Sequence, residues 1–154
     1  MVGVAVSKTN VNMQQIFCEG AISPVFITEV IQKYSSDPAI GAYNIFIGQI
    51  RADTINQQIV SAIEYTAYKE MALEKMHLIR SDIFNKYPII EIEVHHSMGN
   101  VAAGEICLFV LAASAHRKAA MEACNEMVER VKGELPIWGK ECFVEQGYQW
   151  KKNH

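Results

Sequence analysis

Hydrophobic and polar positions alternate with the period of a β-strand in several stretches of the chain. Tyr43, Ile45 and Ile47 alternate with the residues between them, which predicts a strand over residues 41–51. Similar patterns predict an edge strand and three further strands, at residues 13–19, 59–66, 89–96 and 105–112. Between them we expect a polar loop at residues 52–58 and a turn-rich segment at residues 97–104.

Three other stretches have the spacing of amphipathic helices. Ser23 and Pro24 are a typical N-cap and first residue for a helix that ends near residues 35–38. A second helix is expected from about Tyr68 to residues 87–88. A third follows residue 116, and Gly133 with Pro136 is expected to close it. The order of elements predicts a single α+β domain with a mixed or antiparallel sheet and about three helices.

Composition narrows the class of protein. The chain has 154 residues, of which 50% are hydrophobic, so one domain can form a substantial core. A net charge of −3 and a pI near 5.9 argue against nucleic acid or an acidic membrane surface as the main partner. No apolar run is long enough to span a membrane and no export signal is present, so we expect a cytoplasmic protein. Residues 1–12 are weakly patterned and are expected to be weakly ordered.

The cysteines and histidines do not have the spacing of a metal site. The four cysteines lie far apart and form no C-x-x-C pair. Cys107 and Cys124 fall in apolar patterns and are expected to be buried thiols. His95 and His96 are neighbours on a predicted strand, so they point to opposite faces and cannot share a metal. We expect one of them to be structural, and we assign neither to a site.

Residues 114–117 contain the most informative chemistry of the chain. The sequence Ser-Ala-His-Arg places His116 and Arg117 at the predicted start of the third helix. The free N–H groups and the positive end of the helix dipole favour anions there, so this segment predicts a phosphate or carboxylate site. The alternative is that both side chains cap nearby carbonyls or pair with glutamates.

Lys132 lies at the border of the apolar stripe of the same helix. It either extends its stem over apolar surface near the helix C-terminus, or forms part of a pocket wall as an acid, base or electrostatic group. A continuous helix separates it from His116 by roughly 24 Å at 1.5 Å per residue. If both act on one ligand, the site is shared between the two subunits of a homodimer.

Two other candidates are weaker by themselves. Arg51 ends a predicted strand and is either an ordinary strand-end charge or part of an anion site. Trp138 and Trp150 are expected to be packing or interface anchors.

Five segments in order and spacing carry a resemblance over residues 13–152: Ile45–Arg51, Ile63–Tyr68, Gly99 with Gly104 and Glu105, Ser114–Arg117, and Pro136–Trp138. Together they resemble the large, catalytic subunit family of molybdopterin synthase. The resemblance implies a large-subunit domain over residues 13–154 with an α/β-hammerhead type of fold. It also implies a homodimer that binds a small ubiquitin-like subunit, giving a heterotetramer. The C-terminal Gly-Gly of that subunit carries a thiocarboxylate.

The activity implied by the resemblance is sulfur transfer. Such enzymes convert cyclic pyranopterin monophosphate (precursor Z) to molybdopterin, with no metal or organic cofactor in the large subunit. The substrate-binding residues would be Gln49, Ile50, Arg51, His116 and Arg117, and Lys132 would be catalytic.

The chain departs from the family pattern after Trp138. Where relatives often have a second lysine, this chain has Gly139, followed by Lys140 and Glu141. These three are expected beside the substrate, with Lys140 as the candidate replacement although a one-residue shift reverses its side chain. Another departure is Ser97, where relatives often have arginine. Two alternatives therefore stay open: a non-catalytic scaffold for the ubiquitin-like partner or a pterin phosphate, and an unrelated phosphate-binding domain.

Overall fold

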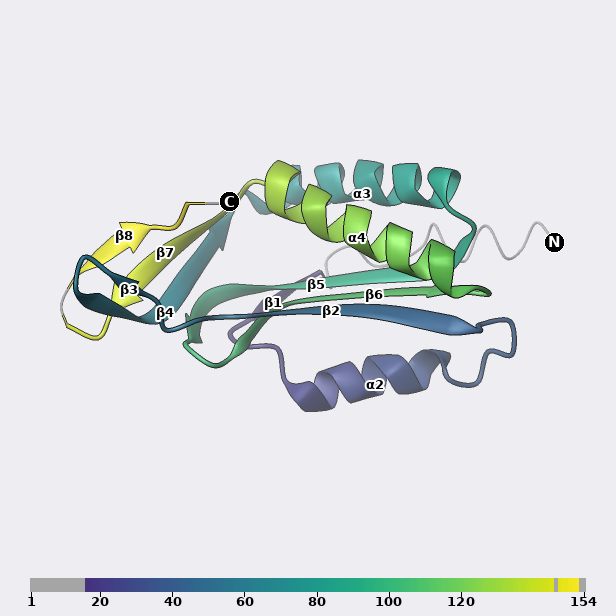
Figure 1. The fold of residues 1–154 in the computed structure, drawn as a ribbon. Helices are drawn as coiled ribbons and strands as arrows, with labels where there is room; N and C mark the ends of the chain where they lie inside the picture. The colour runs from purple at the N-terminus through teal and green to yellow at the C-terminus, as the bar shows by residue number, and fades with distance from the viewer. Residues whose placement is uncertain (1–15, 146, 153–154) are drawn as a thin grey trace.

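The computed structural model describes residues 16–145 and 147–152, in which helices cover both faces of one sheet (Figure 1). The helices are α2 (Pro24–Tyr34), α3 (Lys69–Lys86) and α4 (Arg117–Glu134). The strands are β1 (Phe17–Glu19), β2 (Ala42–Gln49), β3 (Thr54–Ile55), β4 (Gln58–Ala67), β5 (Ile89–Ala102), β6 (Ile106–Ser114), β7 (Ile137–Phe143) and β8 (Tyr148–Trp150). Helices α3 and α4 lie on one face and α2 on the other.

The sheet has the order β2-β6-β5-β4-β7-β8, with β1 beside β5 and β3 beside β4. All pairs are antiparallel except β1 with β5, so the predicted mixed sheet and α+β class are confirmed. Strand β5 pairs with β6 over its first half and with β4 over residues 99–102. It therefore connects the main sheet to the β4–β7–β8 end of the molecule, on the left of Figure 1.

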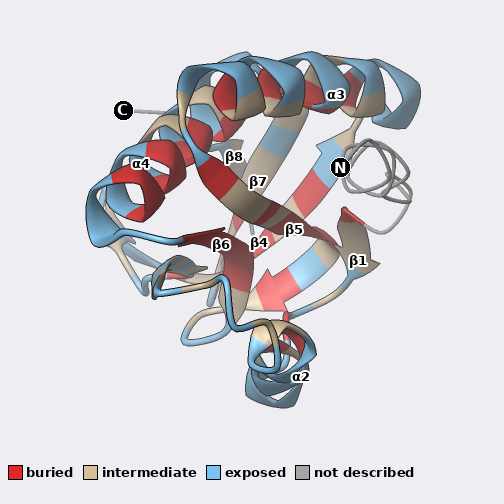
Figure 2. Ribbon diagram, turned by 90° about the vertical axis from the view of Figure 1, so that its right-hand side faces the viewer, coloured by how far each residue is buried: buried red, intermediate tan, exposed pale blue. Residues whose placement is uncertain are grey.

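Each face of the sheet has its own hydrophobic core, and the buried sides of the helices point inward (Figure 2). The larger core lies between the sheet and the α3–α4 pair, and Met76, Ile79 and Met127 are at most 2% exposed there. The smaller core lies between α2 and β6, around Phe109 and Leu111. Cys107 and Cys124 are buried as expected.

Local sequence explains where α2 begins and where α4 ends. The Ser23 hydroxyl accepts a hydrogen bond from the Val25 amide at 3.1 Å, and Pro24 is the first helical residue, as predicted. The predicted end of the third helix at Gly133 and Pro136 is confirmed to within one residue, because α4 ends at Glu134. The helix ends before Pro136, and the Leu135 amide still donates to the Val131 carbonyl.

Two predictions about strands and loops need correction, and two strands were missed. The turn predicted at residues 97–104 is shorter than expected, because β5 runs on to Ala102 and only residues 103–105 turn toward β6. Gly99, with φ of 76°, lets the strand bend while it stays paired. The loop at residues 52–58 contains the short strand β3. Strands β7 and β8 were not predicted at all. Residues 1–12, and the start of the predicted strand at 13–19, lie outside the described residues.

Across the described part of the chain, no helix is long and apolar enough to cross a membrane.

Candidate functional site

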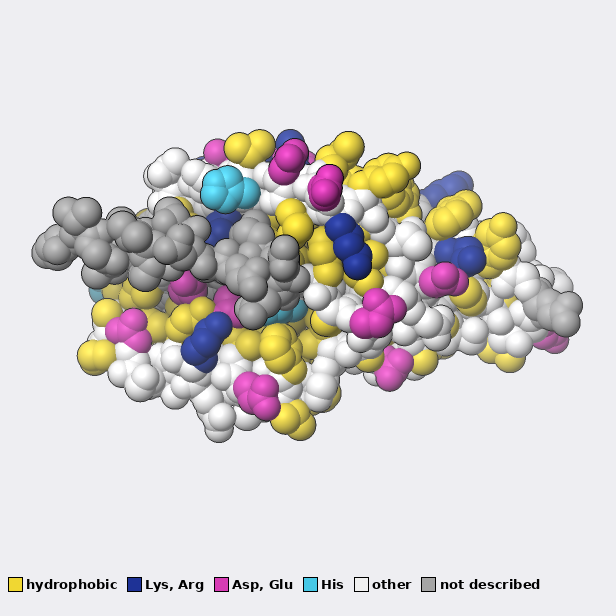
Figure 3. Space-filling view, turned by 180° about the vertical axis from the view of Figure 1, so that it is seen from behind, with side chains coloured by type: hydrophobic (Ala, Val, Ile, Leu, Met, Phe, Trp, Pro, Cys, Tyr) yellow, Lys and Arg dark blue, Asp and Glu magenta, His cyan; other side chains and the backbone are white. Residues whose placement is uncertain are grey.

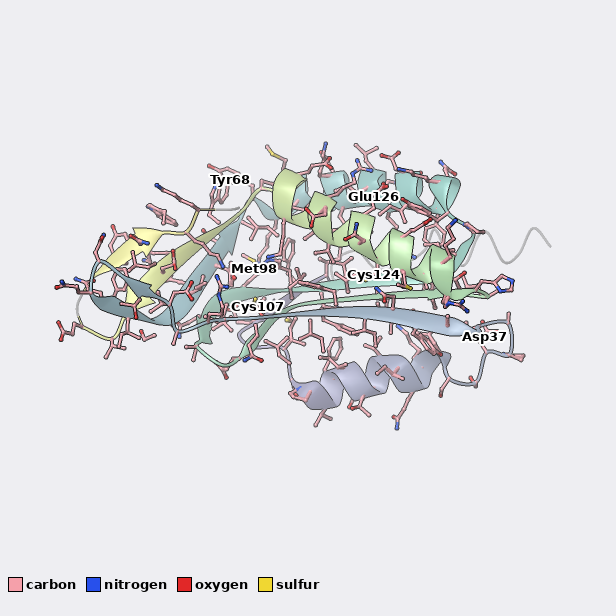
Figure 4. The ribbon with its side chains drawn as sticks, viewed as in Figure 1. Asp37, Tyr68, Met98, Cys107, Cys124 and Glu126 are labelled. Atoms are coloured by element: carbon pink, nitrogen blue, oxygen red, sulfur yellow. The ribbon has the colours of Figure 1, made fainter. Side chains whose placement is uncertain are left out.

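A small cavity, open to solvent, lies at the C-terminal end of α4. Its walls come from β4, β5, β6, the α4–β7 region and the residue after β8. The lining residues are Tyr65, His96, Cys107, Leu108, Val131, Lys132, Leu135, Ile137, Trp138, Gly139 and Lys151. Figure 4 labels Cys107, on the sheet below this end of α4, and Tyr68, at the start of α3. The cavity therefore contains Lys132, the catalytic candidate from the sequence.

His96 is buried against this cavity and is uncharged at neutral pH. Burial, assisted by the nearby positive charge of Lys132, lowers the pKa of the imidazole to about 4. The ring nitrogen Nδ1 lies 2.7 Å from the Ser97 carbonyl and donates to it in the neutral ring. The ring of Tyr65 meets the imidazole edge-on at 4.9 Å. The imidazole is thus a fixed neutral group in the wall.

From the sequence His96 was not expected at a site, although strand alternation correctly placed His95 and His96 on opposite faces. His95 is the structural member of the pair: it lies 2.9 Å from Glu93 Oε1 and its ring contacts Phe26 from α2. Strand alternation gave the face on which each imidazole lies. It did not indicate that the end of α4 leaves one of those faces open.

The remaining polar groups of the sheet wall are also neutral. Burial, with a smaller effect of Cys107, raises the pKa of the Tyr65 phenol above its ordinary value. The Cys107 thiol donates to the Gly48 carbonyl at 3.5 Å. The lysines Lys132 and Lys151 are therefore the formally charged side chains among the lining residues. A cavity with neutral walls and ammonium groups favours an anionic ligand.

The three residues expected beside the substrate after Trp138 separate in the structure. Gly139 lines the cavity. Lys140 points to the other face of β7, where its ammonium lies 3.3 Å from Glu64 Oε2 and 4.7 Å from the centre of the Tyr148 ring. Glu141 is buried and accepts a hydrogen bond from Gln149 at 3.3 Å. Neither Lys140 nor Glu141 is among the cavity residues.

His116 and Arg117 lie at the opposite end of α4. His116 is the N-cap, its side chain makes no capping hydrogen bond, and Arg117 is the first helical residue. Both side chains are exposed. The backbone turn is fixed by Ser114, whose hydroxyl accepts from the His116 amide at 3.3 Å and donates to the Pro88 carbonyl at 3.1 Å. The segment presents two cationic or polar side chains and a helix N-terminus to solvent.

Gln49, Ile50 and Arg51 lie at the Lys132 end of the sheet, because Gln49 pairs with Ile106 at the start of β6. Ile50 is buried and is fixed by backbone hydrogen bonds, while Arg51 is exposed and lies 3.2 Å from Asp53. Ser114, before the His116 segment, pairs instead with Ala42. Within one subunit the two parts of the expected anion site therefore lie at opposite ends of β2.

Most of the chain, including both ends of α4, also matches a known family. The model of the MoaE protein family matches residues 22–134. The chain belongs to the MoaE protein family. Among the described residues of this family member, no three histidine, cysteine or acidic side chains gather to hold a metal ion.

Relatives and solved structures agree with this assignment. The molybdopterin synthase catalytic subunits of Bos taurus and Pyrococcus abyssi are 35% and 33% identical over 127 and 124 residues. These matches cover 82% and 80% of this chain, and 66% and 82% of the relatives, so the chain spans just under two thirds of the bovine protein. Molybdopterin synthase from Staphylococcus aureus superposes with a TM-score of 0.78 at 30% identity, covering 90% of this chain and 97% of that one.

A second structure supports the fold alone. The complex of subunits 1 and 2 of molybdopterin-converting factor from Helicobacter pylori contains a chain with a TM-score of 0.76 at 17% identity. The match covers 90% of each chain. The arrangement of helices and sheet is thus shared by a chain of low sequence identity.

Proposed function

We propose that this MoaE protein is the catalytic subunit of a molybdopterin synthase. It would transfer sulfur from the C-terminal thiocarboxylate of a small ubiquitin-like subunit to precursor Z, forming the dithiolene of molybdopterin. The observation that carries this proposal is the open cavity at the end of α4, in which Lys132 faces neutral walls formed by His96, Tyr65 and Cys107. Membership of the family supplies the reaction, and the cavity supplies a place for an anionic tail.

In this proposal the thiocarboxylate sulfur forms the new C–S bond to precursor Z, water then attacks the tail carbonyl, and the tail C–S bond breaks to leave a carboxylate on the tail and a thiolate on the substrate. Lys132 neutralises the negative charge of the thiocarboxylate and of the anion that forms when water attacks. An ammonium in a partly enclosed cavity stabilises such charge more strongly than one in bulk water. Because His96 is neutral, it does not repel the Lys132 ammonium. Its Nδ1 donates to the Ser97 carbonyl, so its other ring nitrogen, Nε2, is a hydrogen-bond acceptor. Lys132 can also donate a proton to the thiolate that leaves the tail carbonyl.

The phosphate and pterin of precursor Z would bind at the other end of α4, on His116 and Arg117. Charge-assisted hydrogen bonds from a guanidinium and free helix N–H groups are strong donors to phosphate. Arg51, with its neighbours Gln49 and Ile50, completes this anion site. Because these two groups lie at opposite ends of β2, the proposal requires a second subunit.

The edge of the sheet supports a homodimer that would meet this requirement. Strand β2 is the last strand on its side, and Tyr43, Ile45 and Ile47 are exposed along it (37%, 36% and 46%). A two-fold axis that pairs β2 with its copy antiparallel brings the two hydrophobic rows side by side on one face of the joined sheet. It also places the His116 end of one subunit beside the Arg51 and Lys132 end of the other.

The partner and the compartment also belong to the proposal. Exposed aromatic and hydrophobic side chains occur near the cavity, among them Tyr68, Met71, Trp138 and Trp150. Figure 3 shows hydrophobic side chains on the surface between α3 and the β7–β8 end. Such a patch is suited to a protein partner, here the small subunit.

The free thiols of the described cysteines suit the reducing cytoplasm.

Reconstitution of the reaction tests the function directly. The purified chain, the thiocarboxylated small subunit and precursor Z are mixed, and molybdopterin is measured. We expect product with the intact chain, and at least a hundred-fold slower formation with Lys132→Ala. Glu129→Ala, an exposed change on the same helix, is the control and should leave the rate unchanged. Binding of the small subunit with no product from the intact chain would instead support a scaffold.

A further inference from the structure

The pairing of β7 with β8 places Lys151 directly across from Gly139. The register pairs Cys142 with Tyr148, Glu141 with Gln149 and Lys140 with Trp150. One further residue along each strand brings Lys151 opposite Gly139, and the Lys151 amide donates to the Gly139 carbonyl at 2.8 Å. The pairing therefore extends one residue beyond β8 and fixes the backbone of Lys151.

The same register determines on which side the lysine lies. Side chains alternate along a strand, so Lys151 shares a face with Gln149, and Gly139 shares that face with Glu141. The hydrogen bond between Gln149 and Glu141 confirms that these side chains are on one side of the hairpin. Lys151 lines the cavity, whereas Lys140 lies on the opposite face beside Glu64.

At Gly139 the space that a side chain would take beside Lys151 is filled by Ile63 and Tyr65. Directly opposed residues on antiparallel strands have Cβ atoms about 5 Å apart, so a side chain at 139 would be the immediate neighbour of Lys151. A Cβ at 139 would lie 2.8 Å from Ile63 Cγ2 and 3.2 Å from Tyr65 Cε1, so a side chain does not fit without movement. The wall at this point has no side chain of its own, and its charged residue comes from the adjacent strand.

We infer that Lys151 is a second anion-binding residue of the cavity, which holds the C-terminal thiocarboxylate of the small subunit together with Lys132. The inference rests on the proposed function. Lys132 comes from the last turn of α4 and Lys151 from the opposite, sheet side of the cavity. A carboxylate-type group has two acceptor atoms, so two ammonium groups on different walls fix its position as well as its charge.

Binding of the small subunit tests this inference without requiring turnover. The probe is the small subunit with an ordinary C-terminal carboxylate, titrated by calorimetry into the chain. Lys151→Met should weaken binding about ten-fold or more, and Lys151→Arg should retain most of the affinity. Lys152→Met, the exposed neighbouring lysine, is the matched control and should bind as the unchanged chain does.

A shortened probe separates a direct contact from a structural effect. With a small subunit that lacks its last two glycines, Lys151→Met and the unchanged chain should bind equally, because the tail no longer reaches the lysine. Equal binding of the full-length probe by both, or an equal loss with both probes, would overturn the role of Lys151. In turnover, Lys151→Met should raise the KM for the thiocarboxylated subunit more than it lowers kcat. If the unchanged chain forms no molybdopterin, the proposed function fails, whatever Lys151 does in the calorimeter.

Discussion

Lys132 and His96 line the same cavity, and the charge of the lysine adds to burial in holding the pKa of the imidazole at about 4. Lys132→Met removes that charge, so the imidazolium becomes less unfavourable and the pKa of His96 should rise. It should stay below the ordinary 6.5, because burial is the larger cause. Titration of the His96 ring by NMR measures the change. A pKa that is the same in Lys132→Met and in the intact protein would show that the two side chains do not interact.

The low pKa of His96 also predicts a loss of stability in acid. The unfolded imidazole takes up a proton near pH 6.5, while the folded one does so only near pH 4. The unfolded state therefore gains protons first as the pH falls, and the fold loses up to about 3 kcal/mol between these values. Urea unfolding at pH 7, 5.5 and 4 measures this. His96→Gln should lose less stability over the same range, and a parallel loss in both proteins would contradict the prediction.

Arg117→Ala should weaken the use of precursor Z by about ten-fold to a hundred-fold, because a charge-assisted contact to phosphate is lost. The effect should appear in KM for precursor Z and leave the affinity for the small subunit unchanged. Lys118→Ala is the matched control, since it removes the adjacent exposed positive charge. An equal effect of both variants would indicate general attraction of anions rather than a phosphate site.

The dimer should depend on the exposed row of β2. Ile45→Asp places a charge in this row and should convert the dimer to a monomer with little activity. Analytical ultracentrifugation measures the change. Leu78→Asp, on the exposed side of α3, is the control and should remain dimeric. A dimeric Ile45→Asp protein would place the interface elsewhere.

The shared site can be tested in the same system. At a precursor Z concentration below KM, Arg117→Ala and Lys132→Ala subunits are each slow alone, and they should regain activity when mixed and allowed to exchange. Random exchange makes about half of the dimers mixed. In each mixed dimer, one of the two sites combines Arg117 from the Lys132→Ala subunit with Lys132 from the Arg117→Ala subunit, so about one quarter of all sites are intact. No recovery after exchange would mean that each subunit uses its own pair.

Gly139→Ala should destabilise the protein by about 1–3 kcal/mol, because the new Cβ would press on Ile63 and Tyr65. Thermal unfolding measures the change. Gly133→Ala is a suitable control, since the space around Gly133 is open and alanine favours a helix. A Gly139→Ala protein as stable as the original would show that this part of β7 can move.

Local signals in the sequence predicted what neighbouring residues determine. Ser23 and Pro24 fixed the start of α2, and alternation placed His95 and His96 on opposite faces. The turn expected at residues 97–104 is confined to residues 103–105, because β5 continues to Ala102 by pairing with β4 after β6, which only the tertiary structure decides.

The site shows the same limit. Lys132 was visible from the helical pattern, as a lysine beside an apolar stripe. His96 and Lys151 could not be assigned to the site from the sequence. The place of His96 in the wall depends on where α4 ends above β5, and that of Lys151 depends on the register of the three-residue strand β8. Register between distant segments leaves little trace in the composition of either strand.

The uninterrupted course of α4 restricts how this protein can change in evolution. The 18-residue helix carries proposed site residues at both ends. An insertion of one helical turn between them would displace one end by about 5.4 Å and misalign the two halves of the site in the dimer that we propose. Length variation among related chains is therefore expected in surface turns, such as those on either side of β3, while the number of residues between Arg117 and Lys132 stays constant.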